Sequence, residues 1–186
     1  AGTEPMALRR DALAAAAAMI AAAEAVAADG TPDLVATVGV LQVSPGAANV
    51  VPGEVSFTLD VRAATDAARD VALGAIHSAF AHIAGERGIG IERRVLQDLP
   101  ASPCDPALMA LLDAAVAAGG QRPLRLVSGA GHDAMVMAAL CPTAMLFVRC
   151  RDGISHNPAE HVEPADADAA LAAMLGFIER LGERVS

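Results

Sequence analysis

The sequence predicts two domains of different class: a small α+β domain in residues 1–99 and part of an α/β domain in residues 100–186. In the first half, stretches that alternate apolar and polar side chains lie between helical stretches, which favours an antiparallel sheet covered by helices. The second half alternates helices with short apolar segments, which is typical of a buried parallel sheet. Three prolines between Pro100 and Pro106 mark the linker between them.

The first half opens with an expected helix from Pro5 to Ala28. Thr3 is the predicted N-terminal cap, and Pro5 suits the first turn because its missing N–H needs no partner there. The helix is expected to stop at Asp29-Gly30-Thr31-Pro32. A strand rich in Val and Leu is then expected from Leu34 to Val43, and Ser44-Pro45-Gly46 breaks it.

A second strand is expected over residues 54–62, where every second side chain is apolar and one face is therefore buried. A helix is predicted from Ala63 to Arg87, closed by Gly88, and a further alternating strand from Ile89 to Leu99. This order makes up most of a split βαβ sandwich, whose four-stranded form needs one more strand before Ala1.

The second half is expected to contain helices and short buried strands in alternation. The predicted helices are Asp105–Ala118, His132–Leu140 and Pro164–Arg184, and the predicted strands are Leu124–Val127 and Thr143–Arg149. Two strands make a poor sheet alone, so this half also looks incomplete on its N-terminal side.

Composition narrows the class of function. The net charge of −9 argues against nucleic-acid binding, which needs clustered Lys and Arg. The apolar stretch Ala12–Ala28 is interrupted by Glu24 and predicts a packed helix rather than a membrane span, and without a signal-peptide pattern the expected location is the cytoplasm. Cys104, Cys141 and Cys150 lack Cys-x-x-Cys spacing, so reduced thiols are favoured over disulfides or a zinc ribbon.

His156 is the most conspicuous candidate for chemistry. It lies in the polar loop Gly153-Ile154-Ser155-His156-Asn157-Pro158, after a predicted buried strand, where ligands and metals commonly collect in α/β proteins. One interpretation is a metal ligand through neutral imidazole. The other is a loop histidine satisfied by Glu160 or by a backbone carbonyl, and a single histidine taken alone favours this second interpretation.

Three further features each allow two interpretations. The turn Ser128–Asp133 could bind an anion through backbone N–H groups, or it could be an ordinary tight turn. Arg62 could hold a carboxylate by two parallel hydrogen bonds, or it could pair with Asp60 or Glu54 on the surface. Asn49 could donate to a developing oxyanion, or it could simply form a turn.

These motifs occur together and in one order, and as a set they resemble the hydantoinase/carbamoylase family of amidases. The resemblance covers almost the whole chain. The segments that carry it are Ala1–Met6, Asn49–Gly53 with Phe57–Arg62, Ser128–Ala134 and Gly153–Glu160.

The resemblance implies a two-domain metallo-amidohydrolase of the aminoacylase/carboxypeptidase-like clan. Residues 1–99 would be its lid and dimerisation domain with the first strand missing, and residues 100–186 the C-terminal part of its catalytic domain. The family uses two divalent metal ions, zinc or manganese, and a metal-bound hydroxide attacks an amide or ureido carbonyl. The implied partners are a small anionic ureido substrate and a second copy of the chain, with neither nucleic acid nor membrane.

Residue roles carried over by position give His156 as a metal ligand and no general base within the chain. The implied substrate-binding residues are Asn49, Arg62, Gly129, Ala130 and His132, the last of these as a support for the turn. The other metal ligands are expected before Ala1. Allantoate is the first expected substrate and an N-carbamoyl-L-amino acid the alternative. A different class, a non-catalytic dimerisation or ligand-binding module, stays open for this chain alone.

Overall fold

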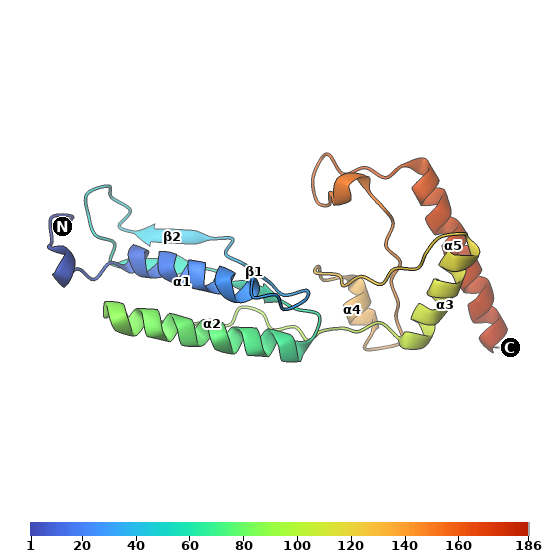
Figure 1. Ribbon diagram of the computed structural model, residues 1–186, viewed down its shortest axis with the longest axis horizontal. Coiled ribbons are helices and arrows are strands. Elements are labelled where there is room, and N and C mark those ends of the chain that lie inside the picture. Colours follow the sequence, from blue (N-terminus) through green and yellow to red (C-terminus); the bar gives the residue numbers. More distant parts are fainter. Residues whose placement is uncertain (186) are drawn as a thin grey trace. The chain divides into compact units, whose positions relative to one another are not determined.

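A computed structural model describes residues 1–185, and the chain divides into two compact units, residues 1–101 and residues 102 onward (Figure 1). Helices combine with small antiparallel sheets, so the predicted mixed α/β class is confirmed at this level. The identity of the units as a lid domain and part of a catalytic domain stays a prediction.

The first long helix, α1 (Ala12–Ala27), begins later than predicted. Asp11, not Thr3, is its cap, with Oδ1 accepting hydrogen bonds from the N–H groups of Leu13 and Ala14 at 3.0 Å. Before it lies only a short 3-10 turn, η1 (Met6–Leu8). The predicted start at Pro5 was wrong because Asp11 caps the first turn with both of these bonds, whereas no side chain caps η1.

Four short strands form one long antiparallel hairpin in two ladders. β2 (Leu41–Ser44) pairs with β3 (Glu54–Phe57), and β1 (Val35–Thr37) pairs with β4 (Asp60–Arg62). The two predicted strands, 34–43 and 54–62, are therefore each split in the middle. Thr58 explains the break, because its Oγ1 accepts the Val40 N–H at 3.2 Å, while its own N–H donates to the Val40 carbonyl at 3.1 Å.

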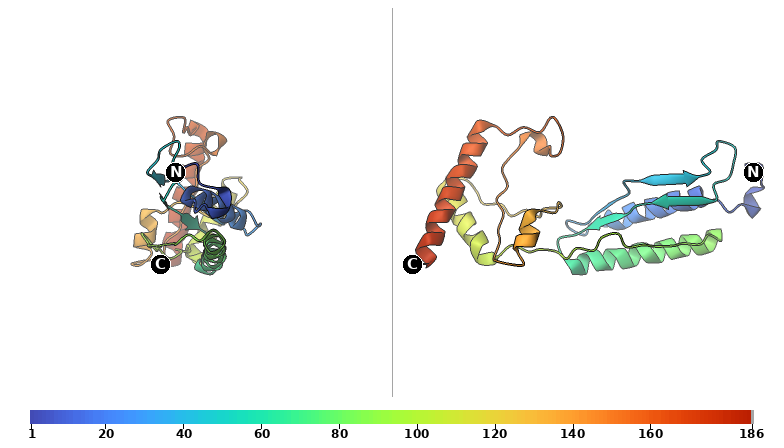
Figure 2. Two further views of the ribbon diagram at one scale, coloured as in Figure 1. Left: turned by 90° about the vertical axis from the view of Figure 1, so that its left-hand side faces the viewer. Right: turned by 180° about the vertical axis from the view of Figure 1, so that it is seen from behind.

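Helix α2 (Asp66–Arg87) completes the first unit. Thr65 caps its start, and Gly88 ends it in the left-handed conformation with φ of 61°. Helix α1 contacts α2, β1 and β3, and α2 also contacts β4; Figure 2 shows both helices running along the hairpin. Small alanines let the helices approach closely around the fully buried Ile76, and Phe80 packs edge-on against Phe57 at 5.9 Å between ring centroids.

Three predicted strands, at 89–99, 124–127 and 143–149, are absent from the described part of the chain. Alternation and apolar runs identify segments that suit a sheet, but a strand exists only where a second strand hydrogen-bonds to it. No described strand forms a ladder with any of these three segments. Several of their apolar side chains are accordingly exposed, with Val95 79% exposed and Leu124 75% exposed.

The second unit is built on helices α3 (Pro106–Ala118) and α5 (Pro164–Val185), which pack together through Leu112, Ala115 and Ala173. Asp105 caps α3 by accepting from the N–H groups of Ala107 and Leu108 at 2.9 Å. The short helix α4 (Asp133–Met137) and the 3-10 turn η2 (Arg151–Gly153) lie between them in sequence.

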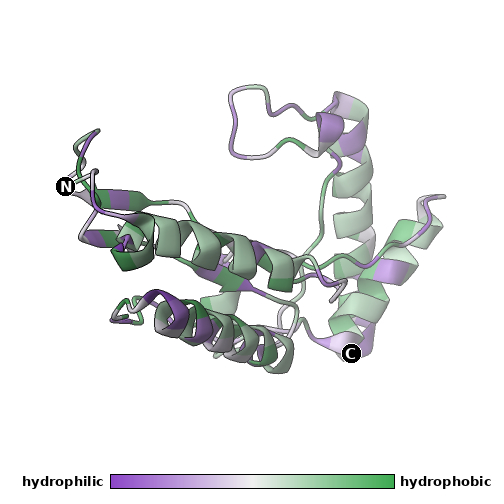
Figure 3. Cartoon of the chain, turned by 60° about the vertical axis from the view of Figure 1, so that its left-hand side comes forward, coloured by the Kyte–Doolittle hydropathy of each residue, from purple (hydrophilic) through white to green (hydrophobic). Residues whose placement is uncertain are grey.

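Helix α1 is coloured as hydrophobic along most of its length in Figure 3, in keeping with its alanines. Among the residues the structure describes, no helix combines the length and the apolar character that a membrane span requires.

Candidate functional site

The loop that carries His156 is a tightly hydrogen-bonded turn. His156 has a φ of 57°, in the left-handed region that non-glycine residues seldom adopt. Its backbone N–H donates to Glu160 Oε2 at 2.9 Å, and the Glu160 N–H donates to the Asn157 carbonyl at 2.9 Å. Glu160 thus engages the backbone of His156 rather than its imidazole, and it holds the residue in this unusual conformation.

The imidazole of His156 is exposed and is oriented by its neighbour. Its Nδ1 lies 2.8 Å from Ser155 Oγ. When the Nδ1–H tautomer donates to the hydroxyl, the lone pair of Nε2 is directed away from the backbone and can bind a ligand. A second-layer hydrogen bond of this kind is usual for metal-binding histidines.

A metal centre needs several donor side chains gathered around one point. The described residues contain no group of three or more His, Cys, Asp or Glu side chains that could hold a metal ion. His156 therefore belongs to no group of three donor side chains within residues 1–185, and these residues by themselves do not fit the two-metal centre that the resemblance implies.

Ion pairs fasten the two ends of the His156 loop together. Glu163 accepts a hydrogen bond from Arg151 Nη2 at 2.8 Å, and its Oε1 lies 3.3 Å from His161 Nε2. The pKa of Glu163 is lowered first by the Arg151 hydrogen bond and then by His161. His161 is thereby directed to Glu163 and belongs to the loop closure.

The Ser128 turn is closed by its own side chains. Ser128 Oγ accepts from the Ala130 N–H at 3.3 Å and lies 3.0 Å from His132 Nε2. The imidazole of His132 therefore contacts the turn directly. An anion at this site would have to displace the Ser128 hydroxyl from Ala130, because that N–H is already engaged. Helix α4 follows with Asp133 in its first turn, as expected for the tight-turn interpretation.

Arg62, at the end of β4, forms a two-point pair with Asp60. Nε donates to Oδ1 at 3.0 Å, and Nη2 donates to Oδ2 at 2.7 Å. Hydrogen bonds from Arg62 lower the pKa of Asp60, and Asp60 raises the pKa of Arg62. The two side chains are about half exposed, at 49% and 52%. To hold a substrate carboxylate, Arg62 would therefore have to exchange one carboxylate for another.

Asn49 lies in the loop between β2 and β3, and its side chain is exposed. Its backbone carbonyl accepts the Gly2 N–H at 2.9 Å, and the carbonyl of Pro52 in the same loop accepts the Ala12 N–H at 3.1 Å. The Gly53 N–H also donates to the Ser44 carbonyl at 3.1 Å. The loop is thus attached both to the segment before α1 and to the first residue of α1.

Asn49 and Arg62 lie at opposite ends of the hairpin. The loop with Asn49 follows the Ser44–Glu54 pair, whereas Arg62 pairs with Val35 at the far end of the second ladder. Eight residue steps separate the two ends (62 − 54), or roughly 25 Å of extended chain. One small molecule cannot touch both residues of a single chain.

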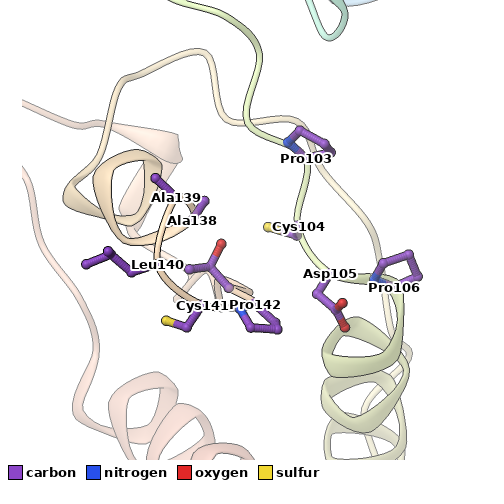
Figure 4. A pocket seen from close by; sticks show the side chains of 10 residues that line it. Pro103, Cys104, Asp105, Pro106, Ala138, Ala139, Leu140, Cys141 and Pro142 are labelled. Carbon is purple, nitrogen blue, oxygen red and sulfur yellow. The ribbon is translucent and has the colours of Figure 1, made fainter.

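A hollow in the second unit does not involve the predicted site residues. It is lined by residues 103–106 and 138–143, including Cys104 and Cys141 (Figure 4). A backbone hydrogen bond from Asp105 to the Thr143 carbonyl, at 2.7 Å, joins its two walls. All three cysteines of the chain are free thiols.

Sequence reasoning missed two contributors to these sites. Ser155 orients His156, and its place directly before the histidine was the only signal in the sequence. Arg9 holds the N-terminal segment, with Nη2 donating to the carbonyls of Gly2 at 2.8 Å and Glu4 at 3.0 Å. No local pattern indicates such a contact, because it depends on how the segment folds back.

Comparison with known proteins places these features in a family. Residues 6–180 match peptidase family M20/M25/M40. Allantoate deiminase of Arabidopsis thaliana is 38% identical over 208 residues, covering 96% of this chain and 39% of that protein. N-carbamoyl-L-amino acid amidohydrolase of Geobacillus stearothermophilus is 41% identical over 160 residues, covering 86% of this chain and 39% of that protein.

The solved structure of a hydantoinase/carbamoylase family amidase from Burkholderia multivorans superposes with a TM-score of 0.88 at 37% identity, covering 97% of this chain and 44% of that one. The chain thus spans about two fifths of the length of the curated relatives described above. The resemblance that the motifs predicted is confirmed: the chain belongs to peptidase family M20/M25/M40.

Proposed function

We propose that the whole protein is a metal-dependent amidohydrolase that cleaves a small ureido carboxylate, with allantoate as the first candidate substrate. The observation that carries this proposal is the 38% identity to allantoate deiminase over 96% of the chain. A further similar structure, AtUAH, was solved in complex with glyoxylate and with (S)-hydroxyglycine, at 28% identity. Both ligands are small carboxylates, which supports a substrate of that class.

An N-carbamoyl-L-amino acid is the second candidate substrate. It is favoured by the 41% identity to the Geobacillus stearothermophilus enzyme, although over a smaller share of the chain, 86%. Both candidates carry a carboxylate and a ureido group, so the same binding residues would serve either one.

In this proposal His156 contributes one ligand, through Nε2, to a pair of zinc or manganese ions. M20 family peptidases are typically dinuclear metal enzymes. Ser155 would keep the Nδ1 proton, and Glu160 would hold the backbone in the conformation that presents the ring. The remaining ligands are proposed to lie outside the described residues, because those residues hold no further cluster.

Arg62 is proposed to release the Asp60 carboxylate and to bind the substrate carboxylate in its place, since both carboxylates offer the same two-oxygen geometry. Asn49 is proposed to contact the ureido end. Gly129 and Ala130 would add backbone N–H groups, and His132 would support that turn through Ser128.

The hairpin geometry also supports a homodimer formed through the first unit. Because roughly 25 Å of hairpin separates Arg62 from the base of the loop that carries Asn49, a site that uses both residues is proposed to take one from each protomer. In this proposal a single chain contributes half of the residues of each of two sites.

The assay that tests the reaction is ammonia release by the whole enzyme from allantoate and from N-carbamoyl-L-amino acids. His156→Ala and Arg62→Ala are each expected to abolish or strongly reduce turnover while the dimer persists in sedimentation. Unchanged turnover in both variants would overturn the site assignment and leave a dimerisation or ligand-binding module as the better description.

Sharing between protomers has a separate test. Asn49→Ala and Arg62→Ala chains are expressed together and purified as a mixed dimer. If each site takes the two residues from different protomers, one site of the mixed dimer holds both substitutions and the other holds neither. Activity is then regained in the mixture although each parent variant is impaired. A mixture as impaired as its parents contradicts sharing, because every site would then carry one defect.

A further inference from the structure

The N-terminal segment makes an unusually close contact with the loop that carries Asn49. The Gly2 N–H donates to the Asn49 carbonyl at 2.9 Å. A Cβ atom added at Gly2 would lie 2.8 Å from that same carbonyl oxygen, and 3.2 Å from its carbon. Cβ atoms do not approach a backbone oxygen so closely, so any other residue at position 2 pushes the two segments apart.

Arg9 keeps Gly2 in this position. Its Nη2 donates to the Gly2 carbonyl at 2.8 Å and to the Glu4 carbonyl at 3.0 Å, folding residues 1–8 into a compact turn. Its Nε is buried, with no hydrogen-bond partner among the described residues. A buried N–H without a partner is unfavourable. The hydrogen bonds of Nη2 to the Gly2 and Glu4 carbonyls therefore have to offset this cost and keep the Arg9 side chain in place.

A second attachment holds the other side of the same loop. The Ala12 N–H donates to the Pro52 carbonyl at 3.1 Å, and Ala12 opens the helix that Asp11 caps. The loop from 45 to 53 is thus held at two points, at its middle residue Asn49 through Gly2 and near its end at Pro52 through Ala12. Arg9 lies between these two anchors in the sequence.

We propose that Gly2 and Arg9 are positioning residues that fix the backbone of Asn49, so that its exposed side-chain amide is presented to the substrate in one direction. The inference rests on the proposed role of Asn49. Its physical content is independent of catalysis: the carbonyl of Asn49 is held through a chain of contacts that runs from Arg9 to Gly2 to Asn49.

The contact itself is tested first, without any substrate. Gly2→Ala and Arg9→Lys are compared with two matched controls in 15N-labelled protein. Gly39→Ala adds a Cβ that meets nothing within 4 Å, and Arg10→Lys alters the neighbouring arginine. The amide resonances of Asn49 and Val50 are expected to shift, and their hydrogen exchange to accelerate, only in the first two variants. Unchanged Asn49 and Val50 signals would overturn the proposal.

The effect on the site is tested by a double-mutant cycle in the whole enzyme. Gly2→Ala and Asn49→Ala are each expected to lower kcat/KM by roughly 10–100-fold, since small misplacement of a binding group has effects of that size. The double variant is expected to be no worse than Asn49→Ala, because Gly2 acts through Asn49. Multiplicative effects would overturn the positioning role, and Arg9→Lys repeats the test at a second point.

Failure of the proposed function gives a different pattern. If Asn49→Ala leaves kcat/KM unchanged, the role of Asn49 in substrate binding is overturned, and the positioning role with it, whatever the resonances show. If Asn49→Ala is impaired while Gly2→Ala and Arg9→Lys behave like their controls, only the positioning role is overturned.

Discussion

At the scale of single residues, the two carboxylate oxygens of Asp60 occupy the Nε and Nη2 donors that Arg62 would offer to a substrate. Exposed pairs of this kind contribute only about 0–1 kcal/mol, because water and salt screen them. A substrate carboxylate can therefore displace Asp60 at small cost.

The Asp60–Arg62 pair makes a prediction about pH. The pKa of Asp60 is lowered in the folded chain, so the pair adds stability above the ordinary Asp value, and this is lost as the pH falls through the lowered pKa. Asp60→Asn is expected to reduce the free energy of unfolding by a few tenths of a kcal/mol at pH 7. The difference should stay constant from pH 5 to 8 and vanish in strong acid; urea titrations at each pH measure it. A difference that grew on acidification would contradict this sign.

Ser155 makes a prediction about metal affinity. Loss of its hydroxyl removes the partner of His156 Nδ1 and leaves the ring free to rotate. Ser155→Ala is expected to weaken zinc binding by the whole enzyme by about 10–100-fold, the usual effect of removing a second-layer partner. Chelator competition measures the affinity. Ser78→Ala is the matched control, because Ser78 donates only to a carbonyl within helix α2; equal affinities in the two variants would refute the role.

At the scale of elements, the sequence predicts the helix ends that depend on neighbouring residues, and it fails for strand bounds that depend on contacts with distant segments. Helix α2 ends at Arg87 as predicted because Gly88 supplies the left-handed cap. Helix α1 starts late because Asp11 outcompetes Thr3, and β1–β4 are split because Thr58 bonds to Val40 across the hairpin.

The candidate site follows the same division. The His156 loop could be predicted from its motif, and the Arg62–Asp60 pair from two charges on one strand face. The opposite placement of Asn49 and Arg62 could not, since it depends on strand register, and neither could the contact from Arg9 to Gly2. The segments 89–99, 124–127 and 143–149 suit strands, but alternation cannot show whether a partner strand is present.

Two glycines of α2 and its cap are expected to respond in opposite directions. Gly74 lies within the helix, and a Cβ there meets nothing within 4 Å, so Gly74→Ala should stabilise by about 0.5–1 kcal/mol. Gly88 has a φ of 61°, so Gly88→Ala should destabilise by about 1–2 kcal/mol. Urea unfolding of both variants checks this. Shifts of the same sign would show that the cap does not end the helix in solution.

At the scale of the whole molecule, the chain has two compact units and matches about two fifths of the length of its curated relatives. Apolar side chains in the segments 95–99 and 124–127 are exposed, as are those on one stretch of α5. Such surface is usual for faces that pack against other protein. The described residues likewise supply only part of the proposed metal centre, since one histidine does not make such a centre.

Residues 1–186 taken alone are therefore expected to bind zinc or manganese weakly. A single imidazole gives far less than the roughly 10–16 kcal/mol that complete structural zinc sites reach. Titration calorimetry should give the same weak binding for this polypeptide and for its His156→Ala variant. A dissociation constant below about 1 μM, equivalent to about 8 kcal/mol, that is lost in His156→Ala would contradict the prediction.

The hairpin also fixes the distance between the Asn49 loop and Arg62, because side chains on one face of a strand recur only at every second residue. Inserting one residue into each of the two paired strands would turn the side chain of Arg62 to the opposite face, toward the helices. Inserting two residues into each strand would restore the original face but would move Arg62 about 7 Å farther from the Asn49 loop. The spacing between these two contacts can thus change only in coarse steps. Substitutions in the strands can therefore change side chains without changing this distance, whereas an insertion of one residue in each strand reverses the face of Arg62.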